Sequence, residues 1–425
     1  MYETQLEKIA QRFSQVPGRF SEENVAKLAA LNHFETFNDT VDGHSRQSLS
    51  GSIVVIDIDI LDEKPQAASI SLASSSTTEP PSYLESQHRP NECILSSLLQ
   101  PRLNQFTKAL GFLSRCDRYS TKEVDCFHAL DRIGRAVMIK AKSDPSYGEF
   151  LINPGRIGLG MRYFRKNMAY IDVEERTDIK YSLVMADWLD EEHNWIDATP
   201  PTTDGRAQLV LSFDPPVILP EAQAEKWGAL YEPTTSALSA RRVRASAVIK
   251  RHPKFQKMEM SDSFDVTIAN MLPFDFVCVS SVPLSHPNQI PDVLNVARQY
   301  CYLQEMVTSL SLGPPMFYPY DMDVSVADIV EFKDKPIPTS LIALDASFER
   351  MDNGDIVIGL ALSCVAAKMN IVLRRDFKIE VNSSGAINLH DLHRIVEKTG
   401  NLGLCASYIL GQLGMKHRRL SVNTS

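Results

Sequence analysis

The residues in this sequence whose types and spacing could do chemistry are two aspartates, Asp57 and Asp59, at the end of the apolar run SIVVIDID. One carboxylate can attack a phosphoryl group as a nucleophile, and a carboxyl two residues later can protonate the leaving group. That chemistry places both side chains at the end of a buried parallel strand, which is apolar on both faces and continues into a crossover helix. The surrounding residues therefore decide whether the pair is catalytic or structural.

The segment departs from this requirement in two ways. Isoleucine alternates with aspartate along Ile56–Ile60, which is typical of an antiparallel strand with one buried and one exposed face. The motif of haloacid-dehalogenase-like phosphatases continues with a glycine and a hydroxyl residue, whereas an isoleucine and Leu61 follow Asp59 here. The polar segment Asp62–Pro65 is also too short for a crossover helix. We therefore predict a β-hairpin with Asp57 and Asp59 on its exposed face, and a phosphatase-like enzyme is the alternative.

Three further motifs are predicted to be structural. The glycine-rich stretch Gly155–Gly160 resembles a phosphate-binding loop, but no apolar strand precedes it and MRYF predicts a strand after it. His390 and His393 fall on one helix face without a third metal ligand in view. The LxxLL box Leu95–Leu99 has the form that nuclear receptors bind, but apolar residues at helical spacing indicate packing within the chain.

The composition limits the classes of function. The chain has 425 residues, a hydrophobic fraction of 44% and a formal net charge of −9, which argues against attraction of the whole chain to nucleic acid or an anionic membrane. Its seven cysteines show no paired spacing, which indicates a reducing compartment and predicts neither a disulfide framework nor a zinc site. No apolar run approaches the roughly 20 residues needed to span a bilayer, and the charged amino terminus is not typical of a signal peptide.

The periodicity of apolar residues predicts an α+β fold in four regions. Residues 1–145 are expected to be mainly helical with one inserted β-hairpin, and residues 146–382 to form a β-rich, mostly antiparallel body with interspersed helices. Residues 383–414 are expected to form a helical pair, followed by a basic tail at 415–425. Strands come in runs and do not alternate regularly with helices, which favours α+β over a doubly wound sheet.

Individual helices carry clear boundary signals. Ser21 precedes two glutamates and is predicted to cap a helix, and Asn388 and Gly400 are predicted to begin and end another. A longer helix is expected from about Pro291, because apolar residues step by three and four along it as far as Leu310. The basic segment Arg241–Lys257 is predicted to be a solvated hairpin edge, with contact to an acidic partner as the alternative.

Several segments in their order resemble subunit 1 of the Mediator complex, the coactivator that bridges transcription factors and RNA polymerase II. The amino-terminal ones are SEENVAKLAALNHFETF, SGSIVVIDIDILDEKPQAASISL, NECILSSLLQPRLNQFTKALGFLSRCDRY and DCFHALDRIGRAV. The later ones are GRIGLGMRYF, AQLVLSFDPPVILPEAQAEKW and IPDVLNVARQYCYLQEMVTSL. The likeness runs from about Ser21 to Leu413 and rests on element order and apolar positions.

The resemblance implies a nuclear, non-enzymatic subunit of the Mediator middle module with no cofactor. Its expected partners are other middle-module subunits directly, and transcription activators and the RNA polymerase II machinery indirectly, without contact to nucleic acid or membrane. The sequence ends without the long tail in which animal members carry their receptor boxes, so a compact member of the fungal kind is expected. Two alternatives remain, namely a phosphatase-like enzyme built on Asp57 and Asp59 and an unrelated intracellular adaptor.

Overall fold

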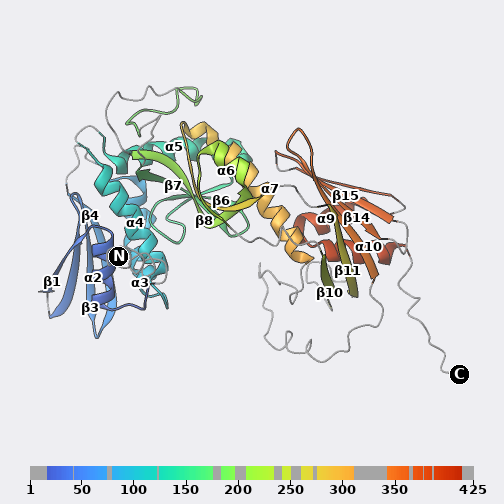
Figure 1. Ribbon diagram of the computed structural model, residues 1–425. Helices are drawn as coiled ribbons and strands as arrows, with labels where there is room; N and C mark the ends of the chain where they lie inside the picture. Colours follow the sequence, from blue (N-terminus) through green and yellow to red (C-terminus); the bar gives the residue numbers. More distant parts are fainter. Residues whose placement is uncertain are drawn as a thin grey trace, which may run out of the picture. The chain divides into compact units, whose positions relative to one another are not determined.

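The computed structural model divides the chain into two compact units (Figure 1). The first unit is made of residues 1–216, 226–230 and 279–294, and the second of residues 217–225, 231–278 and 295–425. No helix in the described part of the chain is long and apolar enough to cross a membrane. The structure describes residues 17–41, 43–73, 79–121, 124–175, 183–196, 207–233, 242–249, 260–270, 275–310, 342–362, 367–376, 378–384 and 387–413.

The amino-terminal part of the first unit contains a four-stranded antiparallel sheet, drawn in blue in Figure 1. Its strands follow one another in the order β1-β2-β3-β4. Asp62 and Glu63 form the turn between β3 and β4 with φ values of 50° and 59°, as a tight two-residue hairpin turn requires. The strands are β1 (Glu35–Val41), β2 (His44–Ser50), β3 (Val54–Leu61) and β4 (Lys64–Leu72).

This sheet corrects the expectation of a mainly helical amino-terminal region with a single hairpin. The hairpin β3–β4 is present, but two more strands precede it. Their sequences, ETFNDTV and HSRQSLS, are too polar for the apolar alternation that marks a half-buried strand. The overall α+β class holds, because helices accompany the sheet. They are α2 (Glu22–Leu31), α3 (Pro90–Leu98), α4 (Asn104–Tyr119) and α5 (Cys126–Ser143).

A second sheet has the strand order β5-β6-β7-β8-β12-β9, and most of its strands belong to the first unit. Helix α5 lies close to it at Gly134, where an added Cβ would come within 2.3 Å of Leu159 Cδ1. The segment YSLVMADW, residues 181–188, predicts a strand because it is rich in apolar and aromatic residues, but residues 183–188 lie outside any strand. The elements are β5 (Glu149–Ile152), β6 (Leu159–Phe164), β7 (Asn167–Glu175), β8 (Ala207–Pro220), β9 (Leu230–Pro233), β12 (Phe276–Pro283) and α6 (Glu221–Trp227).

The second unit is built on a six-stranded sheet in the order β10-β11-β13-β14-β15-β16. Strands β11 and β13 pair in parallel, and the other neighbours pair antiparallel. The strands are β10 (Arg242–Ile249), β11 (Met260–Asn270), β13 (Ile342–Arg350), β14 (Ile356–Leu362), β15 (Ala367–Leu373) and β16 (Ile379–Ser383). The helices are α7 (Ile290–Ser309), whose last 15 residues belong to this unit, α9 (Leu389–Thr399) and α10 (Leu402–Gln412).

The predicted helix boundaries and the apolar seam of α7 are confirmed. The Ser21 hydroxyl accepts the Asn24 N–H at 3.1 Å, and the side-chain oxygen Oδ1 of Asn388 accepts the N–H groups of His390 and Asp391 at the start of α9. Gly400 ends α9 with φ +57°, in the left-handed region that favours glycine. The seam residues are all buried, namely Val293, Val296, Tyr300, Leu303, Val307 and Leu310.

Candidate functional site

Asp57 and Asp59 lie on the outward face of β3, in the middle of the amino-terminal sheet. The isoleucines that alternate with them are buried, as predicted, and the two aspartates are half-buried. The Ser48 hydroxyl donates to Asp57 Oδ1 at 2.6 Å, and Arg46 Nε donates to Asp59 Oδ1 at 2.6 Å. Both donors are the direct cross-strand neighbours on β2. The two carboxylates are therefore held by side chains across the strand ladder.

This geometry does not match the one that phosphoryl transfer through an aspartate requires. Strand β3 is antiparallel to both of its neighbours, and only two residues separate it from β4. No crossover helix follows, so the carboxylates do not lie at the end of a parallel strand, where such active sites open. In the part of the chain that the structure describes, no group of three or more His, Cys, Asp or Glu side chains is arranged to hold a metal ion.

The glycine-rich stretch Gly155–Gly160 is organised by Asn153 and not by a ligand. The Asn153 side chain accepts the Gly158 N–H at 2.9 Å and donates to the carbonyl oxygens of Tyr83 and His88 at 2.8 and 3.0 Å. Gly158 has φ +127°, which a residue with a Cβ rarely adopts. The Gly158 amide, which could bind phosphate, already donates a hydrogen bond within the chain. This stretch therefore has a structural role, as predicted.

A buried charge cluster lies behind that loop, centred on Asp172 of β7. Asp172 is fully buried, and it accepts two hydrogen bonds from Arg115 of α4, at 3.2 Å from Nε and 2.5 Å from Nη2. Arg156 Nη2 lies 3.7 Å from the same carboxylate, and its guanidinium stacks on the Tyr170 ring at 3.8 Å. Burial lowers the pKa of Arg115, and the nearby Asp172 carboxylate raises it by more. The pKa of Arg115 therefore lies above its ordinary value.

A second aspartate of α4 also has a structural role that sequence reasoning missed. Asp117 accepts the backbone N–H groups of Ser52, Ile53 and Val54 at 2.8, 2.7 and 3.1 Å. Two of these amides directly precede β3 and the third belongs to its first residue, so the carboxylate fixes the start of the strand that carries Asp57. The sequence shows only an aspartate within the amphipathic segment NQFTKALGFLSRCDRY, and nothing in the local sequence identifies its partners 63 to 65 residues away.

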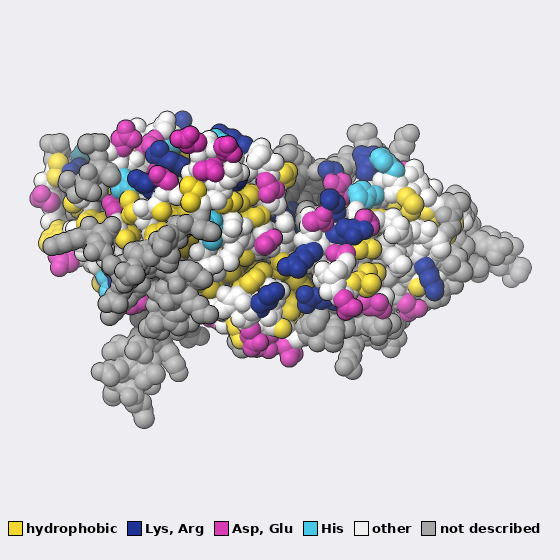
Figure 2. Space-filling model, turned by 90° about the horizontal axis from the view of Figure 1, so that it is seen from above, with side chains coloured by type: hydrophobic (Ala, Val, Ile, Leu, Met, Phe, Trp, Pro, Cys, Tyr) yellow, Lys and Arg dark blue, Asp and Glu magenta, His cyan; other side chains and the backbone are white. Residues whose placement is uncertain are grey.

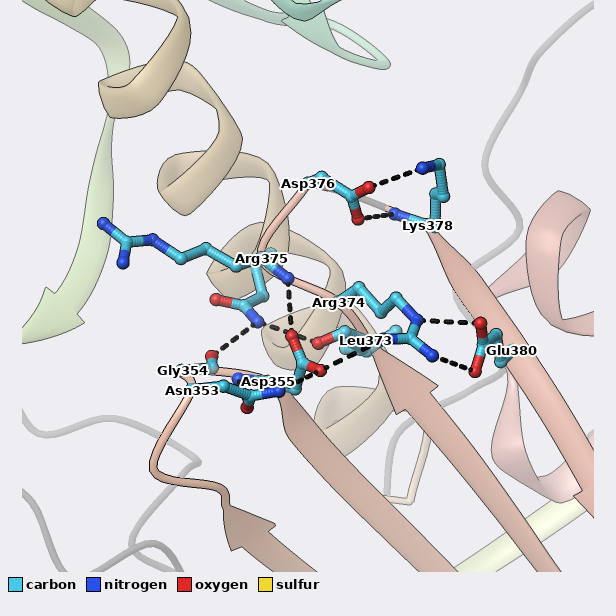
Figure 3. Close-up of polar contacts among 10 residues, drawn as sticks. Asn353, Gly354, Asp355, Leu373, Arg374, Arg375, Asp376, Lys378 and Glu380 are labelled. Atoms are coloured by element: carbon cyan, nitrogen blue, oxygen red, sulfur yellow. Dashed lines mark hydrogen bonds and ion pairs between the residues drawn. The ribbon is translucent and has the colours of Figure 1, made fainter.

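In the second unit, polar side chains tie together two turns at one end of the sheet (Figure 3). Gln299 of α7 donates through Nε2 to the carbonyl oxygens of Gly354 and Leu373, at 3.1 and 2.8 Å. Asp355 accepts the Arg375 N–H at 3.0 Å and the Asn353 side-chain amide at 2.9 Å. The stretch from Asn353 to Asp355 is thus part of the hairpin turn between β13 and β14.

The outer rim of this turn cluster is formed by ion pairs. Arg374 binds Glu380 with two hydrogen bonds, at 2.7 and 2.8 Å, and Lys378 Nζ lies 2.7 Å from Asp376 Oδ2 (Figure 3). The hydrogen bond from Arg374 lowers the pKa of Glu380, and the hydrogen bond from Lys378 lowers the pKa of Asp376. Each carboxylate has a cation of this chain as its partner, which is an arrangement that stabilises turns.

The leucines of the LxxLL box differ in burial. Leu98 is 1% exposed and Leu95 is half-buried, whereas Leu99 is 59% exposed at the carboxyl end of α3. The prediction that the box packs within the chain is therefore confirmed for Leu98 and wrong for Leu99. Because two of the three leucines are at least partly enclosed, α3 cannot enter a receptor groove without leaving its own core.

The remaining candidates hold no site in the described residues. His390 is exposed and His393 is half-buried on α9, and no metal-binding group includes them. Within the basic segment, residues 242–249 form β10, and the rest lies outside the described residues, as does the tail at 415–425. On the described part of the face in Figure 2, side chains of both charges are interspersed with short hydrophobic stretches.

The comparisons with known proteins name a family. The family model described as Mediator of RNA polymerase II transcription subunit 1 matches residues 6–178 and 160–311, which together cover well over half of the 425 residues. No curated protein matches the chain. The matched residues include the amino-terminal sheet, the buried charge cluster and the whole of α7. The chain therefore belongs to the Mediator subunit 1 family.

Proposed function

We propose that this chain is a non-catalytic subunit of the Mediator middle module, which acts in the nucleus by protein–protein contacts. Family membership makes it a Mediator subunit concerned with transcription regulation. The finer role is that it binds neighbouring middle-module subunits and relays signals from transcription activators to the RNA polymerase II machinery. The observation that carries the proposal is the family match across residues 6–311.

The geometry of the chain's own chemical groups supports a non-catalytic role. The aspartate pair that most resembles an active site accepts hydrogen bonds from Ser48 and Arg46. In the glycine-rich stretch, the Gly158 N–H donates to the Asn153 side chain. Free cysteines are present, but burial raises the pKa of the Cys126 and Cys405 thiols to about 12, which keeps them protonated and weakly nucleophilic near neutral pH.

The test is recovery of the tagged chain from nuclear extract at physiological salt, followed by mass spectrometry. We expect other middle-module subunits to be recovered with the wild-type chain and equally with Asp57→Asn. Recovery of the chain alone, with the tag shown to be accessible, contradicts the proposal. A cytoplasmic location without Mediator subunits favours an unrelated adaptor instead.

A second arm addresses the phosphatase alternative directly. The purified chain is incubated with magnesium and p-nitrophenyl phosphate, and we expect no turnover above a buffer control. Turnover that Asp57→Asn abolishes, while Asp187→Asn on an exposed loop leaves it unchanged, shows that β3 carries an active site. Asp187 is a suitable control because its side chain is 83% exposed and pairs with Arg132 of the same chain.

A further inference from the structure

The two edge strands of the amino-terminal sheet, β4 and β1, differ in how far they are protected from pairing with another strand. Strand β4 is covered, because α3 packs against it and Asn91 Oδ1 accepts the Ile70 N–H at 3.1 Å. It also carries Pro65 and a register shift, both of which prevent an edge from pairing with another strand. Strand β1, at the other edge in Figure 1, has seven residues in unbroken register with β2.

Strand β1 has two acidic side chains but lacks the other features that usually protect an edge. It contains no Lys, Arg or Pro and no bulge, and none of its residues is buried. Among the edge strands whose side chains are described, β5, β9 and β16 are shorter, with four, four and five residues. Strand β1 is therefore longer than these three edge strands and, unlike β4, is not covered by a described helix along its edge.

The backbone groups on this edge can be assigned from the register. Val41 pairs with His44 across two residues, and such a hairpin makes its first pair a hydrogen-bonded one, with alternate pairs following. The N–H and C=O groups of Thr36, Asn38 and Thr40 therefore point away from β2. Asp39 Oδ1 accepts the Thr40 N–H at 2.7 Å, and the structure gives the Thr36 and Asn38 amides no partner among the described residues.

The side chains beside this edge indicate what an added strand would carry. Glu35, Phe37 and Asp39 lie on the outward face of β1, and Phe37 is 55% exposed with a serine opposite it on β2. On β3, two strands away from this edge, Asp57 and Asp59 lie on the same face of the sheet. Cross-strand neighbours interact at about 5 Å, and opposite charges or apolar pairs across a ladder are favourable. A complementary strand has a basic residue, an apolar one and another basic one at alternate positions.

We infer that β1 is a docking edge, which an extended segment of another Mediator subunit completes as a fifth strand by β-augmentation. The segment has Lys or Arg opposite Glu35 and Asp39, and an aromatic or β-branched residue opposite Phe37. The backbone hydrogen bonds to Thr36 and Asn38 supply affinity, and the alternating side chains supply selectivity. This inference rests on the proposed function, because it takes its partner from the same complex.

The test uses the full chain and Mediator purified from cells that lack it. Hydrogen exchange is measured on the free chain and after incorporation into the complex. We expect the Thr36 and Asn38 amides to exchange at least about tenfold more slowly in the complex, as ladder hydrogen bonds protect amides. Incorporation with unchanged exchange at both amides overturns the inference and leaves the proposed function intact, whereas failure to incorporate overturns both.

Variants test the same edge independently. Asn38→Pro removes an outward N–H without removing a bond to β2, so the sheet is expected to persist while incorporation falls at least about tenfold. Asn38→Thr keeps the N–H and is expected to incorporate like the wild type. Equal incorporation of both folded variants overturns the inference, and if the proline variant unfolds, the exchange measurement decides.

Charge is tested with a matched pair of double variants. Glu35→Gln/Asp39→Asn is expected to weaken incorporation several-fold and to reduce its salt dependence, because it removes the acidic half of the ladder. Glu191→Gln/Glu192→Gln, on an exposed loop, removes the same charge and is expected to have no effect. Equal effects of the two double variants overturn the assignment of a basic partner.

Two other occupants of the edge give different results. If residues 1–16 of this chain cover β1, the Thr36 and Asn38 amides are already slow in the free chain and become fast when those residues are deleted. If a second copy covers it, the free chain is a dimer by light scattering and Asn38→Pro makes it a monomer. Either result overturns the inference.

Discussion

Replacement of Asp172 by asparagine is expected to be among the most destabilising conservative changes in the first unit. The substitution keeps the shape of the side chain and removes its charge. Arg115 and Arg156 then face each other across a neutral amide, and Arg156 is only 5% exposed. Its Nε has no hydrogen-bond partner among the described residues, and without the Asp172 charge it retains only the Tyr170 ring and a long contact of 3.5 Å to the Lys108 carbonyl oxygen.

The magnitude follows from the burial of the cluster. Loss of one partner of a buried ion pair costs about 3–5 kcal/mol, because an uncompensated charge remains in a medium of low polarity. The matched control is Asp187→Asn, which breaks an Arg–Asp pair of similar length, 2.9 Å, whose carboxylate side chain is 83% exposed. Exposed pairs contribute about 0–1 kcal/mol, so the two substitutions should differ by several kcal/mol.

Tryptophan fluorescence in urea measures this difference in the correct part of the chain. All three tryptophans, Trp188, Trp195 and Trp227, belong to the first unit, so the signal reports its unfolding and not that of the second unit. With a slope of about 2–3 kcal/mol/M, Asp172→Asn should lower the midpoint by about 1–2 M. A midpoint shift no larger than that of Asp187→Asn refutes the idea that the cluster stabilises the fold.

Three further predictions concern packing, a turn and thiol reactivity. Leu98→Ala should cost about 2–5 kcal/mol in thermal unfolding of the first unit, and Leu99→Ala no more than about 0.5 kcal/mol, because only Leu98 is buried. Gln299→Leu should destabilise the second unit by about 2–4 kcal/mol in circular dichroism, since the carbonyl oxygens of two turns lose their donor, while an exposed Asn382→Leu should not. Iodoacetamide at pH 8 should leave Cys126 of the native chain unmodified, because burial raises the pKa of its thiol to about 12 and the thiolate fraction increases only as pH rises toward that value. Modification at Cys126, mapped by mass spectrometry of peptides from the native chain, contradicts this.

The elements that could be predicted are those whose signal is local. The alternation of Ile56, Ile58 and Ile60 predicted which face of β3 is buried, because one strand contains the whole pattern. The seam of α7 was found for the same reason, since 20 consecutive residues carry it. Helix caps at Ser21 and Asn388 also depend on contacts within three residues.

The elements that could not be predicted depend on partners distant in the sequence. Asp172 and Asp117 accept hydrogen bonds from residues far away in the sequence, because Arg115 lies 57 residues from Asp172 and Ile53 lies 64 residues from Asp117. No periodicity records such a pairing, because each carboxylate is stabilised only once the tertiary fold has formed. The same is true of Gln299, which links two turns of the second unit from a helix.

Strand β1 was not predicted for a different reason, and this reason concerns its exposure. A strand that buries one face of its own chain must alternate, and β1 does not, because no residue of it is buried. Its residues are still good strand formers, with Thr36, Phe37, Thr40 and Val41 in seven positions. A regular edge strand without a bulge or proline leaves its outward backbone groups open to pairing with another strand. Periodicity therefore missed β1 because this strand buries neither face, whereas its open edge appears only once the register with β2 is known.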